Sequence, residues 1–473
     1  MADNAPTKKL TPALFPRSFR KTYPEVVHGE GCFLFTRDGK KILDASGGAA
    51  VVSIGHGAAS VAHAIAAQAR SLAYVHSSQF TTRAAAELAR RLLALAPPNF
   101  HDSADGPGRV LFTSGGSEAA ETALKLCRQF FLECNEPLRT KFISRAQSYH
   151  GATLGALALS GNVKRRAPFL PLVPEANHIV PCYCYRCPLD LQYPSCAVAC
   201  ADDLENKIRA LGAENVAAFF VEPISGATLG AVAPPPEYLP RIAEICRRNH
   251  ILLVADEVMT GMGRTGKNFA VDHWDVEPDI ILVGKGIASG YAPLGAVLVT
   301  GRIASAIERG SGAFLHGFTY SAHPVSAAAG LAVLDYIAEK SLFARVAPAG
   351  RELLRALEPL RELPIARSIV GDVRGTGLLL GIEFVRPLGQ TAKMPEPFDP
   401  SANIATRVYD AALRRGVLTY PIQGCADGLR GDHILLAPPF TISSYEISFL
   451  ANSLLESVTE VSQFISISSG GRQ

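Results

Sequence analysis

The most chemically suggestive residue of the chain is Lys285, which stands between Gly284 and Gly286 directly after the apolar run 280–283. An amine at the end of a buried strand loses part of its water shell, which disfavours the charged form and lowers its pKa. A lysine in this state is suited to forming a Schiff base with a carbonyl compound. A phosphate-binding or structural lysine fits the same position, so this residue alone leaves the chemistry open.

A second charged group follows the apolar run 251–255, where Asp256 and Glu257 stand at the predicted end of a buried strand. A carboxylate in such a place is costly unless a cation lies beside it. The protonated nitrogen of a pyridine ring would be one such cation, and an arginine from another part of the chain would be another.

A glycine-rich turn follows the apolar run 110–112 and leads into a helical pattern at 117–133. Free N–H groups and the positive end of the helix dipole bind phosphate at such a point, although Ser117 could equally serve as an ordinary N-cap. The residues of this turn are Ser114, Gly115, Gly116 and Ser117.

An aromatic residue follows the apolar run 142–143, in the stretch Ser148-Tyr149-His150-Gly151. The ring of Tyr149 could stack on a flat ligand. Taken alone, this stretch is explained more simply by a tyrosine packed into a loop.

The stretch 261–266 matches the GxGxxG pattern of dinucleotide-binding turns. Residues 256–260 separate it from the preceding strand, and the residues after it open no apolar helix. A match outside the strand–turn–helix context is weak, so we do not interpret it as a nicotinamide or flavin site.

The elements that must position these residues follow from short apolar runs that alternate with helical patterns. Strands are predicted at 110–112, 142–143, 217–221, 251–255, 280–283 and 295–299, and helices at 117–133, 236–249 and 324–339. This alternation is typical of a mostly parallel sheet covered on both faces. Ligands of such sheets bind at the carboxyl ends of the strands, so we expect the polar residues named above to meet at one edge.

The length of 473 residues is too great for one ordinary hydrophobic core and favours two lobes. A hairpin is predicted at 30–46 and a helix at 82–95. Residues 340–465 predict a smaller α/β lobe with strands at 378–384 and 433–436. The proline-rich segment 386–400 is expected to be a surface loop.

The balance of 46 basic and 43 acidic residues gives no electrostatic reason to expect a nucleic acid or a membrane as partner. No apolar run approaches the roughly 20 residues that a membrane-spanning helix needs. Residues 1–9 contain no apolar signal core. We therefore expect a cytoplasmic location.

Taken together, these stretches resemble the class III, or ω-, aminotransferase family of fold type I pyridoxal-phosphate-dependent enzymes, from about residue 20 to 460. The blocks that carry the resemblance are SGGSEAAETALK (114–125), SYHGATLGAL (148–157), VEPISG (221–226), ADEVMTGMGRTG (255–266), DIILVGKGI (279–287), HGFTYSAHP (316–324) and VRGTGLLLGIEF (373–384). Their order and spacing make the set specific, although each block alone is not.

The resemblance implies an α/β fold of type I. Its large domain has a mostly parallel seven-stranded sheet covered by helices, and its smaller α/β domain is built from the two chain ends. We predict that residues 1–60 form the N-terminal part of the small domain and that residues 336–473 form its C-terminal part. Residues 61–335 are predicted to form the large cofactor-binding domain, with a cysteine-rich insertion at 182–200.

The resemblance also assigns roles to the matching residues. It implies that Lys285 forms the Schiff base with pyridoxal 5'-phosphate and moves the proton in the reaction. Asp256 would keep the ring nitrogen of the cofactor protonated, and Tyr149 would stack on the ring. The residues expected to bind the cofactor are Ser114, Gly115, Gly116, Ser117, Tyr149, His150, Glu222, Asp256, Val258, Lys285 and Thr319. Because the matching threonine comes from the neighbouring subunit, Thr319 implies a homodimer with shared active sites.

Several positions bear on the substrate. Relatives acting on ornithine or 4-aminobutyrate carry a glutamate that gates an arginine, and Ala227 stands at that position; Met259 replaces a glutamine that bonds the cofactor there. Arg374 matches the carboxylate-binding arginine and is our candidate for holding a substrate carboxylate. Arg430 lies near, but out of register with, a mobile arginine of amine:pyruvate enzymes. Ala50 falls in the stretch that lines the substrate pocket, where the lack of large aromatic residues favours a roomier site.

Half of the ten cysteines lie in the insertion 182–200. The pairs Cys184/Cys187 and Cys196/Cys200 have a spacing that suits zinc, but the gap between the pairs is short. We interpret them as reduced thiols in a packed surface insertion, with structural zinc as the alternative.

The function that these observations favour is transfer of an amino group from an amine, ω-amino acid or amino acid to a 2-oxo acid such as pyruvate or 2-oxoglutarate. Racemisation, decarboxylation and aminomutase chemistry begin with the same lysine and stay open. A non-catalytic binding protein is disfavoured because Lys285, Asp256 and Tyr149 are all intact.

Overall fold

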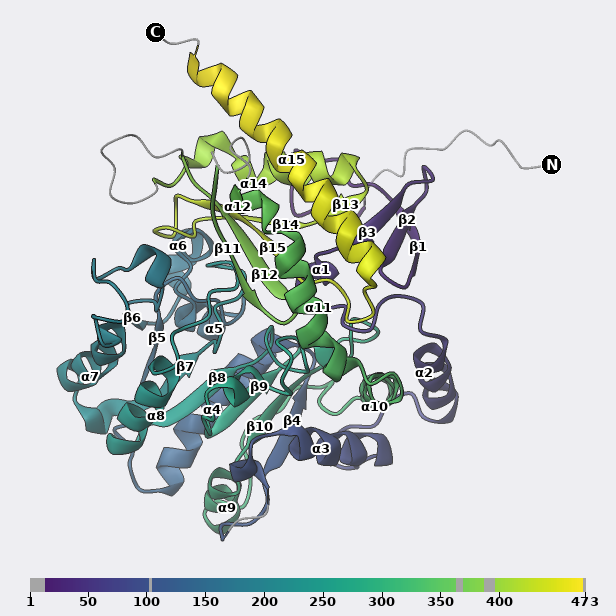
Figure 1. Cartoon of the computed structure of the whole chain (residues 1–473). Coiled ribbons are helices and arrows are strands. Elements are labelled where there is room, and N and C mark those ends of the chain that lie inside the picture. The colour runs from purple at the N-terminus through teal and green to yellow at the C-terminus, as the bar shows by residue number, and fades with distance from the viewer. Residues whose placement is uncertain (1–12, 102–103, 363–368, 387–395, 471–473) are drawn as a thin grey trace.

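The computed structural model describes residues 13–101, 104–362, 369–386 and 396–470. A seven-stranded sheet runs through its larger lobe in the order β4-β10-β9-β8-β7-β5-β6 (Figure 1). Neighbours from β9 to β6 pair in parallel, and β10 is antiparallel to both β4 and β9. The predicted mostly parallel, seven-stranded sheet is therefore confirmed. Its strands are β4 (Arg109–Thr113), β5 (Lys141–Arg145), β6 (Asn177–Ile179), β7 (Val216–Val221), β8 (Leu252–Asp256), β9 (Ile280–Val283) and β10 (Gly295–Val299).

Helices cover both faces of this sheet because successive side chains of each central strand point to opposite sides. On one face Phe220 and Leu282 pack with helices α4 and α9, and on the other Phe219 packs with α7 and α8 and Ile281 with α3 and α10. Full burial of each such side chain stabilises the fold by about 1.5–3 kcal/mol. The helices of this lobe are α2 (Ala59–Ser71), α3 (Arg83–Leu95), α4 (Gly116–Glu133), α5 (Leu154–Leu159), α6 (Val163–Arg166), α7 (Ala199–Leu211), α8 (Tyr238–Arg248), α9 (Gly301–Arg309) and α10 (Pro324–Glu339).

Two four-stranded sheets form the smaller lobe, in the orders β1-β2-β3-β13 and β11-β12-β15-β14. The first joins the two ends of the chain, because β13 pairs in parallel with β3 through Val417 and Leu43. The predicted hairpin is the β2–β3 pair. The strands are β1 (Val26–Glu30), β2 (Phe33–Thr36), β3 (Lys41–Asp44), β11 (Val370–Thr376), β12 (Leu379–Phe384), β13 (Val417–Leu418), β14 (Tyr420–Gln423) and β15 (Asp432–Leu436). The domain boundaries at residues 60 and 335 stay a prediction.

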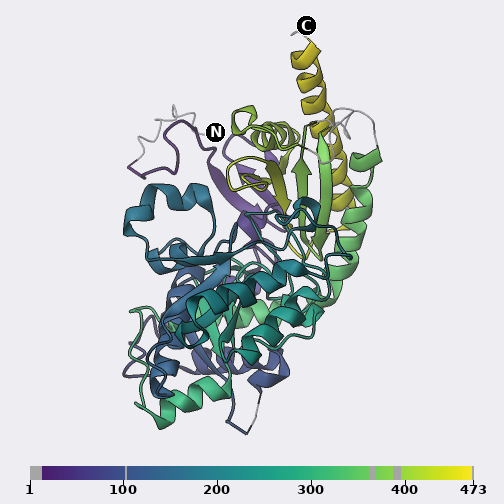
Figure 2. The ribbon, with the colours of Figure 1, turned by 90° about the vertical axis from the view of Figure 1, so that its left-hand side faces the viewer.

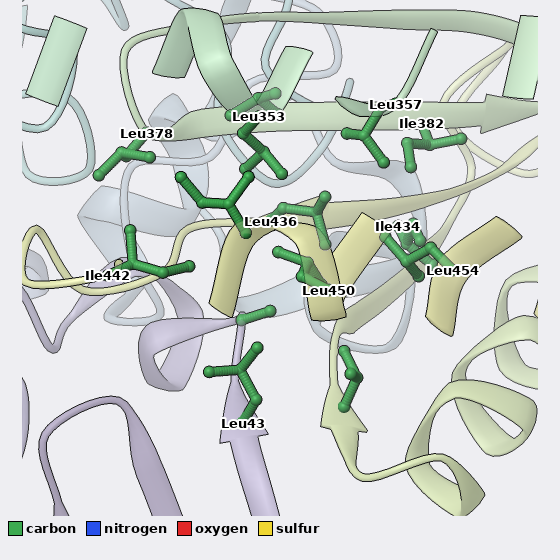
Figure 3. Close-up of a cluster of buried hydrophobic side chains, with 14 of the residues drawn as sticks. Leu43, Leu353, Leu357, Leu378, Ile382, Ile434, Leu436, Ile442, Leu450 and Leu454 are labelled. Carbon is green, nitrogen blue, oxygen red and sulfur yellow. The ribbon is translucent and has the colours of Figure 1, made fainter. Parts of the chain in front are cut away.

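The core of this lobe lies between its sheets and the helices packed on them. Figure 3 shows Leu43 of β3 close to leucines and isoleucines of β12, β15, α11 and α15. Seen from the side in Figure 2, helices of the C-terminal region run along the outer flank of these strands. The remaining helices of this part are α1 (Gly47–Ala50), α11 (Leu342–Ala356), α12 (Pro359–Glu362), α14 (Ile404–Arg414) and α15 (Ser444–Gly470).

The predicted surface loop at 386–400 lies mostly outside the described residues, as do residues 1–9. The described residues on either side of this loop lie together, since Val385 and Pro397 form an isolated antiparallel bridge. Among the helices of the described ranges, none is both long and apolar enough to cross a membrane.

Arg264, from the GxGxxG stretch, links segments that are distant in the chain. Its buried guanidinium donates hydrogen bonds to the carbonyl oxygens of Val52 (3.3 Å), Leu378 (3.1 Å) and Pro438 (2.6 Å), and it lies 4.6 Å from the centre of the Phe440 ring. The stretch thus braces the two lobes, and the next helical segment begins only at Ala270.

We predict that Arg264→Met lowers the free energy of unfolding by about 2–4 kcal/mol, because buried carbonyl groups are left without a donor. Urea unfolding followed by circular dichroism measures the change. Arg241→Met is the control, because Arg241 forms an exposed ion pair with Asp202 and such pairs contribute little. Equal stability of the two variants would contradict the bracing role.

Candidate active site

Lys285 lies on a cavity of about 200 Å³ at the carboxyl ends of the central strands. Of the polar residues predicted to meet at this edge, Ser117, Tyr149, Asp256 and Lys285 do so, because each follows a different strand of the same sheet. Ser114 and Glu257 do not line the cavity. The cavity is lined by Gly116, Ser117, Tyr149, His150, Gly151, Glu222, Ile224, Ala227, Asp256, Val258, Met259, Thr260 and Lys285.

The amine of Lys285 receives no hydrogen bond or ion pair from the described residues, so nothing among them replaces the water that its charged form loses on burial. Burial lowers its pKa to about 8, although Asp256 and Glu222 act in the opposite direction. The backbone of Lys285 has φ of +44°, a left-handed conformation that is uncommon outside glycine and is often found at functional sites. The amine is therefore partly neutral, and nucleophilic, at ordinary pH.

Asp256 ends β8 and is nearly fully buried. One carboxylate oxygen lies 2.8 Å from Nδ1 of His150, and the other accepts the N–H of Val258 at 3.1 Å. The opposite ring nitrogen of His150, Nε2, is buried with no hydrogen-bond partner in the described structure. The pair therefore presents a fixed, hydrogen-bonded carboxylate to the cavity.

Glu222, directly after β7, holds the loops on the other side of the cavity. Its carboxylate accepts the backbone N–H groups of Tyr149 at 2.9 Å and Gly226 at 2.8 Å. The buried Arg145, at the end of β5, donates to the carbonyl oxygen of Glu222 at 2.5 Å and to the hydroxyl of Ser225 at 3.1 Å. Glu222 thereby positions the Tyr149 backbone at the cavity wall.

The glycine-rich turn leads into the start of α4 as expected. Gly116 and Ser117 face the cavity, and the Ser117 hydroxyl accepts the N–H of Ala152 at 3.0 Å. Ser114 lies outside the wall, where its own N–H donates to the Glu118 carboxylate at 2.8 Å. Gly115, the residue before the helix, is likewise absent from the wall.

A narrow part of the cavity is shaped by Val258. A side chain added at Gly116 would lie 2.9 Å from Val258 Cγ1, and one at Gly284 would lie 3.1 Å from the same atom. Met259 closes the cavity nearby and packs against Gly226. The wall here is apolar, and at Ala227 it is formed by a small residue.

Ala50 is buried next to the cavity instead of on its wall. It belongs to a hydrophobic cluster with Ile224, and Met259 packs against that cluster. Residues 47–50 all have positive φ, including +63° at Ala50, which is costly for an alanine. A substrate-facing role for Ala50 stays a prediction.

Arg374, our candidate for the substrate carboxylate, lines a separate cavity of about 560 Å³. Its guanidinium donates to the carbonyl oxygens of Gly230, at 2.8 Å, and Leu229, and forms ion pairs with Asp372 at 3.0 Å and Glu383 at 2.9 Å. All of its nitrogens are thus engaged away from Lys285. Without a gating glutamate at position 227, this arginine is held by Glu383.

Thr319 is exposed and lies apart from the Lys285 cavity within this chain. Its carbonyl oxygen accepts a hydrogen bond from the hydroxyl of Tyr74 at 2.6 Å. Its predicted role toward a neighbouring subunit stays a prediction.

The cysteine-rich segment packs against β12. Tyr183, between Cys182 and Cys184, is buried and donates to the carboxylate of Glu383, which Arg186 also binds at 2.5 Å. All cysteines are free thiols, and no group of three or more His, Cys, Asp or Glu side chains in the described ranges is arranged to hold a metal ion.

Some residues of this region were not identified from the sequence. Ile224 and Thr260 line the cavity, Arg145 braces Glu222, and the Arg165 guanidinium lies 4.5 Å from the centre of the Tyr149 ring. Arg145 carried a usable signal, since it is a charged residue at the end of an apolar strand. Arg165 stood only in the basic run 164–166, which a solvated surface explains equally well.

The comparisons with known proteins agree with this architecture. The family model of class-III aminotransferases matches residues 15–458. The chain is 39% identical to YodT, an uncharacterized aminotransferase of Bacillus subtilis, over 93% of this chain and 96% of that protein. It is 34% identical to gamma aminobutyrate transaminase 2 of Solanum lycopersicum, over 90% and 88% of the two chains. A solved structure of an amine transaminase from an uncultivated Pseudomonas species, in the PLP-bound form, matches with a TM-score of 0.85 and 38% identity, over 97% and 99% of the chains.

The lowered pKa of Lys285 predicts its reactivity in protein prepared without cofactor. Acetylation of Lys285 by limiting acetic anhydride should rise with pH through a midpoint near 8, because only the neutral amine reacts, and level off above it. Peptide mass spectrometry measures the labelling, with Nα-acetyl-lysine in the same solution as the reference for an ordinary amine near 10.4. A midpoint equal to that of the reference would contradict the effect of burial.

Proposed function

Because the chain belongs to the class III aminotransferase family, we propose that it moves an amino group from an amine, ω-amino acid or amino acid to a 2-oxo acid in a ping-pong reaction through Lys285. Pyridoxal-phosphate-dependent amino transfer is the activity that its relatives share. The observation that carries the proposed site is the convergence on one cavity of a buried carboxylate, a helix start and an amine that has no partner among the described residues.

The residues of the cavity fit pyridoxal phosphate, which the family implies. Gly116 and Ser117 would hold the phosphate at the start of α4, and Asp256 would hold a proton on the ring nitrogen. Tyr149 and Val258 would enclose the ring, in the part of the cavity that a side chain at position 116 would fill. When bound, the cofactor supplies an electron sink that stabilises negative charge on the substrate carbon.

Lys285 would act as the acid–base group. Its amine, with a pKa of about 8, can take a proton from the substrate carbon and return one to the cofactor side at ordinary pH. The carboxylate of Asp256 would stay in position next to the ring nitrogen because His150 and the Val258 N–H fix both of its oxygens. The apolar wall formed by Val258 and Met259 would keep water from the reacting atoms.

The cavity wall departs from the pattern expected of the 4-aminobutyrate and ornithine enzymes, so the proposed donor stays an amine, an ω-amino acid or an amino acid. Ala227 and Met259 stand where the 4-aminobutyrate and ornithine enzymes are expected to carry glutamate and glutamine. The relatives are named for both 4-aminobutyrate and amines, which supports testing carboxylated and plain amines side by side.

We also propose that the enzyme is a homodimer in which Thr319 serves the partner's site. Thr319 is exposed and is not one of the residues that line the cavity of its own chain, which supports this. The cytoplasmic location stays a prediction from the sequence.

Single-turnover spectroscopy against a panel of amines and amino acids tests the proposed reaction. A donor of the right class should bleach the visible absorbance of the bound cofactor, near ~420 nm, and raise a band near ~330 nm. Addition of pyruvate or 2-oxoglutarate should reverse the change. Loss of handedness of an enantiopure amino acid without oxo-acid consumption would instead identify a racemase.

Lys285→Ala should abolish amino transfer while leaving the fold intact, because Lys285 supplies the only amine among the described residues of the cavity wall. Activity and unfolding midpoint are measured together, with Lys267→Ala, an exposed lysine, as control. Substantial turnover by the alanine variant would overturn the assignment.

Asp256→Asn should retain bound cofactor but lose a factor of about 10² or more in rate, because a neutral amide no longer stabilises charge on the ring. Glu257→Gln is the matched control, since this neighbouring carboxylate points away from the cavity and accepts the N–H of Val271 at 2.8 Å. If Asp256→Asn keeps the full rate, the residue has another role.

A further inference from the structure

Arg165, on the short helix α6, stands over the ring of Tyr149. Its guanidinium carbon lies 4.5 Å from the ring centre, and the side chain is exposed. Within the described residues, its guanidinium makes no hydrogen bond or ion pair. Stacking on an aromatic face uses the plane of the guanidinium and leaves its N–H edges free for a ligand.

The positive charge of Arg165 acts on the amine of Lys285. The pKa of Lys285 is lowered chiefly by burial, and Arg165 lowers it further, against the raising effect of Asp256 and Glu222. The guanidinium therefore lies within electrostatic reach of the reactive amine, next to Tyr149, which is itself a residue of the cavity wall.

The other arginines with a candidate role are engaged elsewhere. Arg374 is held by Asp372, Glu383 and two carbonyl groups beside a different cavity. Arg430 forms an ion pair with Asp427 at 2.6 Å on the surface. Both would have to break existing bonds to receive a substrate, whereas Arg165 would not.

We propose that Arg165 is the residue that binds the carboxylate of the substrate, both in the 2-oxo acid acceptor and in donors that carry an acid group. This rests on the proposed function, because every 2-oxo acid acceptor brings a carboxylate to the cavity. The planar fork of the guanidinium matches the two carboxylate oxygens, and Tyr149 holds the fork in place. Plain amines have no such group and do not need Arg165.

The two half-reactions of one enzyme test this assignment. Holoenzyme is reacted with 4-aminobutyrate and with butylamine, which differ by the carboxylate, and its aminated form is then reacted with pyruvate. Arg165→Ala should reduce kcat/KM at least about tenfold for 4-aminobutyrate and pyruvate, mainly through KM, from the loss of a charge-assisted pair. The rate with butylamine should stay within about twofold, as for loss of a screened surface charge.

Two further variants separate a specific contact from general electrostatics. Lys164→Ala removes the neighbouring charge of α6, whose amine donates a hydrogen bond to Gln423 at 3.3 Å, and should leave the rates with all three substrates within about twofold. Arg165→Lys keeps the charge without the fork and should recover part of the loss. An equal loss for butylamine, no loss for any substrate, or weaker retention of pyridoxal phosphate by Arg165→Ala would each overturn the proposal.

Calorimetric titration of the holoenzyme with glutarate, which has neither an amino nor an oxo group, measures carboxylate binding without turnover. Arg165→Ala should weaken it at least about tenfold. Unchanged affinity, or no binding by the wild type, would overturn the role of Arg165. A wild type that transfers no amino group would instead contradict the proposed function, and the titration would still decide for or against Arg165.

Discussion

The burial of charge at the carboxyl ends of β7, β8 and β9 is the constraint on which this site depends. A charge removed from water is unstable unless hydrogen bonds or a counter-charge replace its solvation. Glu222 is satisfied by backbone N–H groups, and Asp256 by His150 and a further N–H. Lys285 receives no such bond from the described residues, so burial shifts its pKa to about 8. The same sheet thus stabilises two carboxylates and leaves one amine reactive.

Buried arginines hold the loops that surround these groups. Arg145 and Arg264 each donate to backbone carbonyl oxygens that lie far away in the chain. Arg374 does the same for Leu229 and Gly230, in the loop that continues from the cavity wall at Ala227. Loops cannot satisfy their own carbonyl groups when they are buried, and a guanidinium with several N–H donors can serve segments from both lobes at once.

The structural role of these arginines bears on which arginine can bind a substrate. An arginine braced by two carboxylates and two carbonyl groups is part of the framework, whatever its position in the sequence. A guanidinium stacked on an aromatic ring and otherwise unbonded within the described structure is available to a ligand. The cysteine-rich segment contributes to the framework, because Tyr183 and Arg186 hold the carboxylate that holds Arg374.

The sequence by itself determined the fold class, the positions of most central strands and the identity of the residues that meet at their ends. These follow from local patterns: an apolar run of strand length and a polar residue directly after it, which the alternation with helices brings to one edge. Strands with few fully buried residues escaped this reasoning, since β6 has three residues with one buried, and β11 and β14 are mostly half-buried. Only the tertiary structure decided that β10 runs antiparallel, that Arg374 is bound by Glu383, and that Arg165 stands over Tyr149. Such outcomes depend on which partner lies nearest in space after folding, and competition among distant partners leaves no periodic pattern in the sequence.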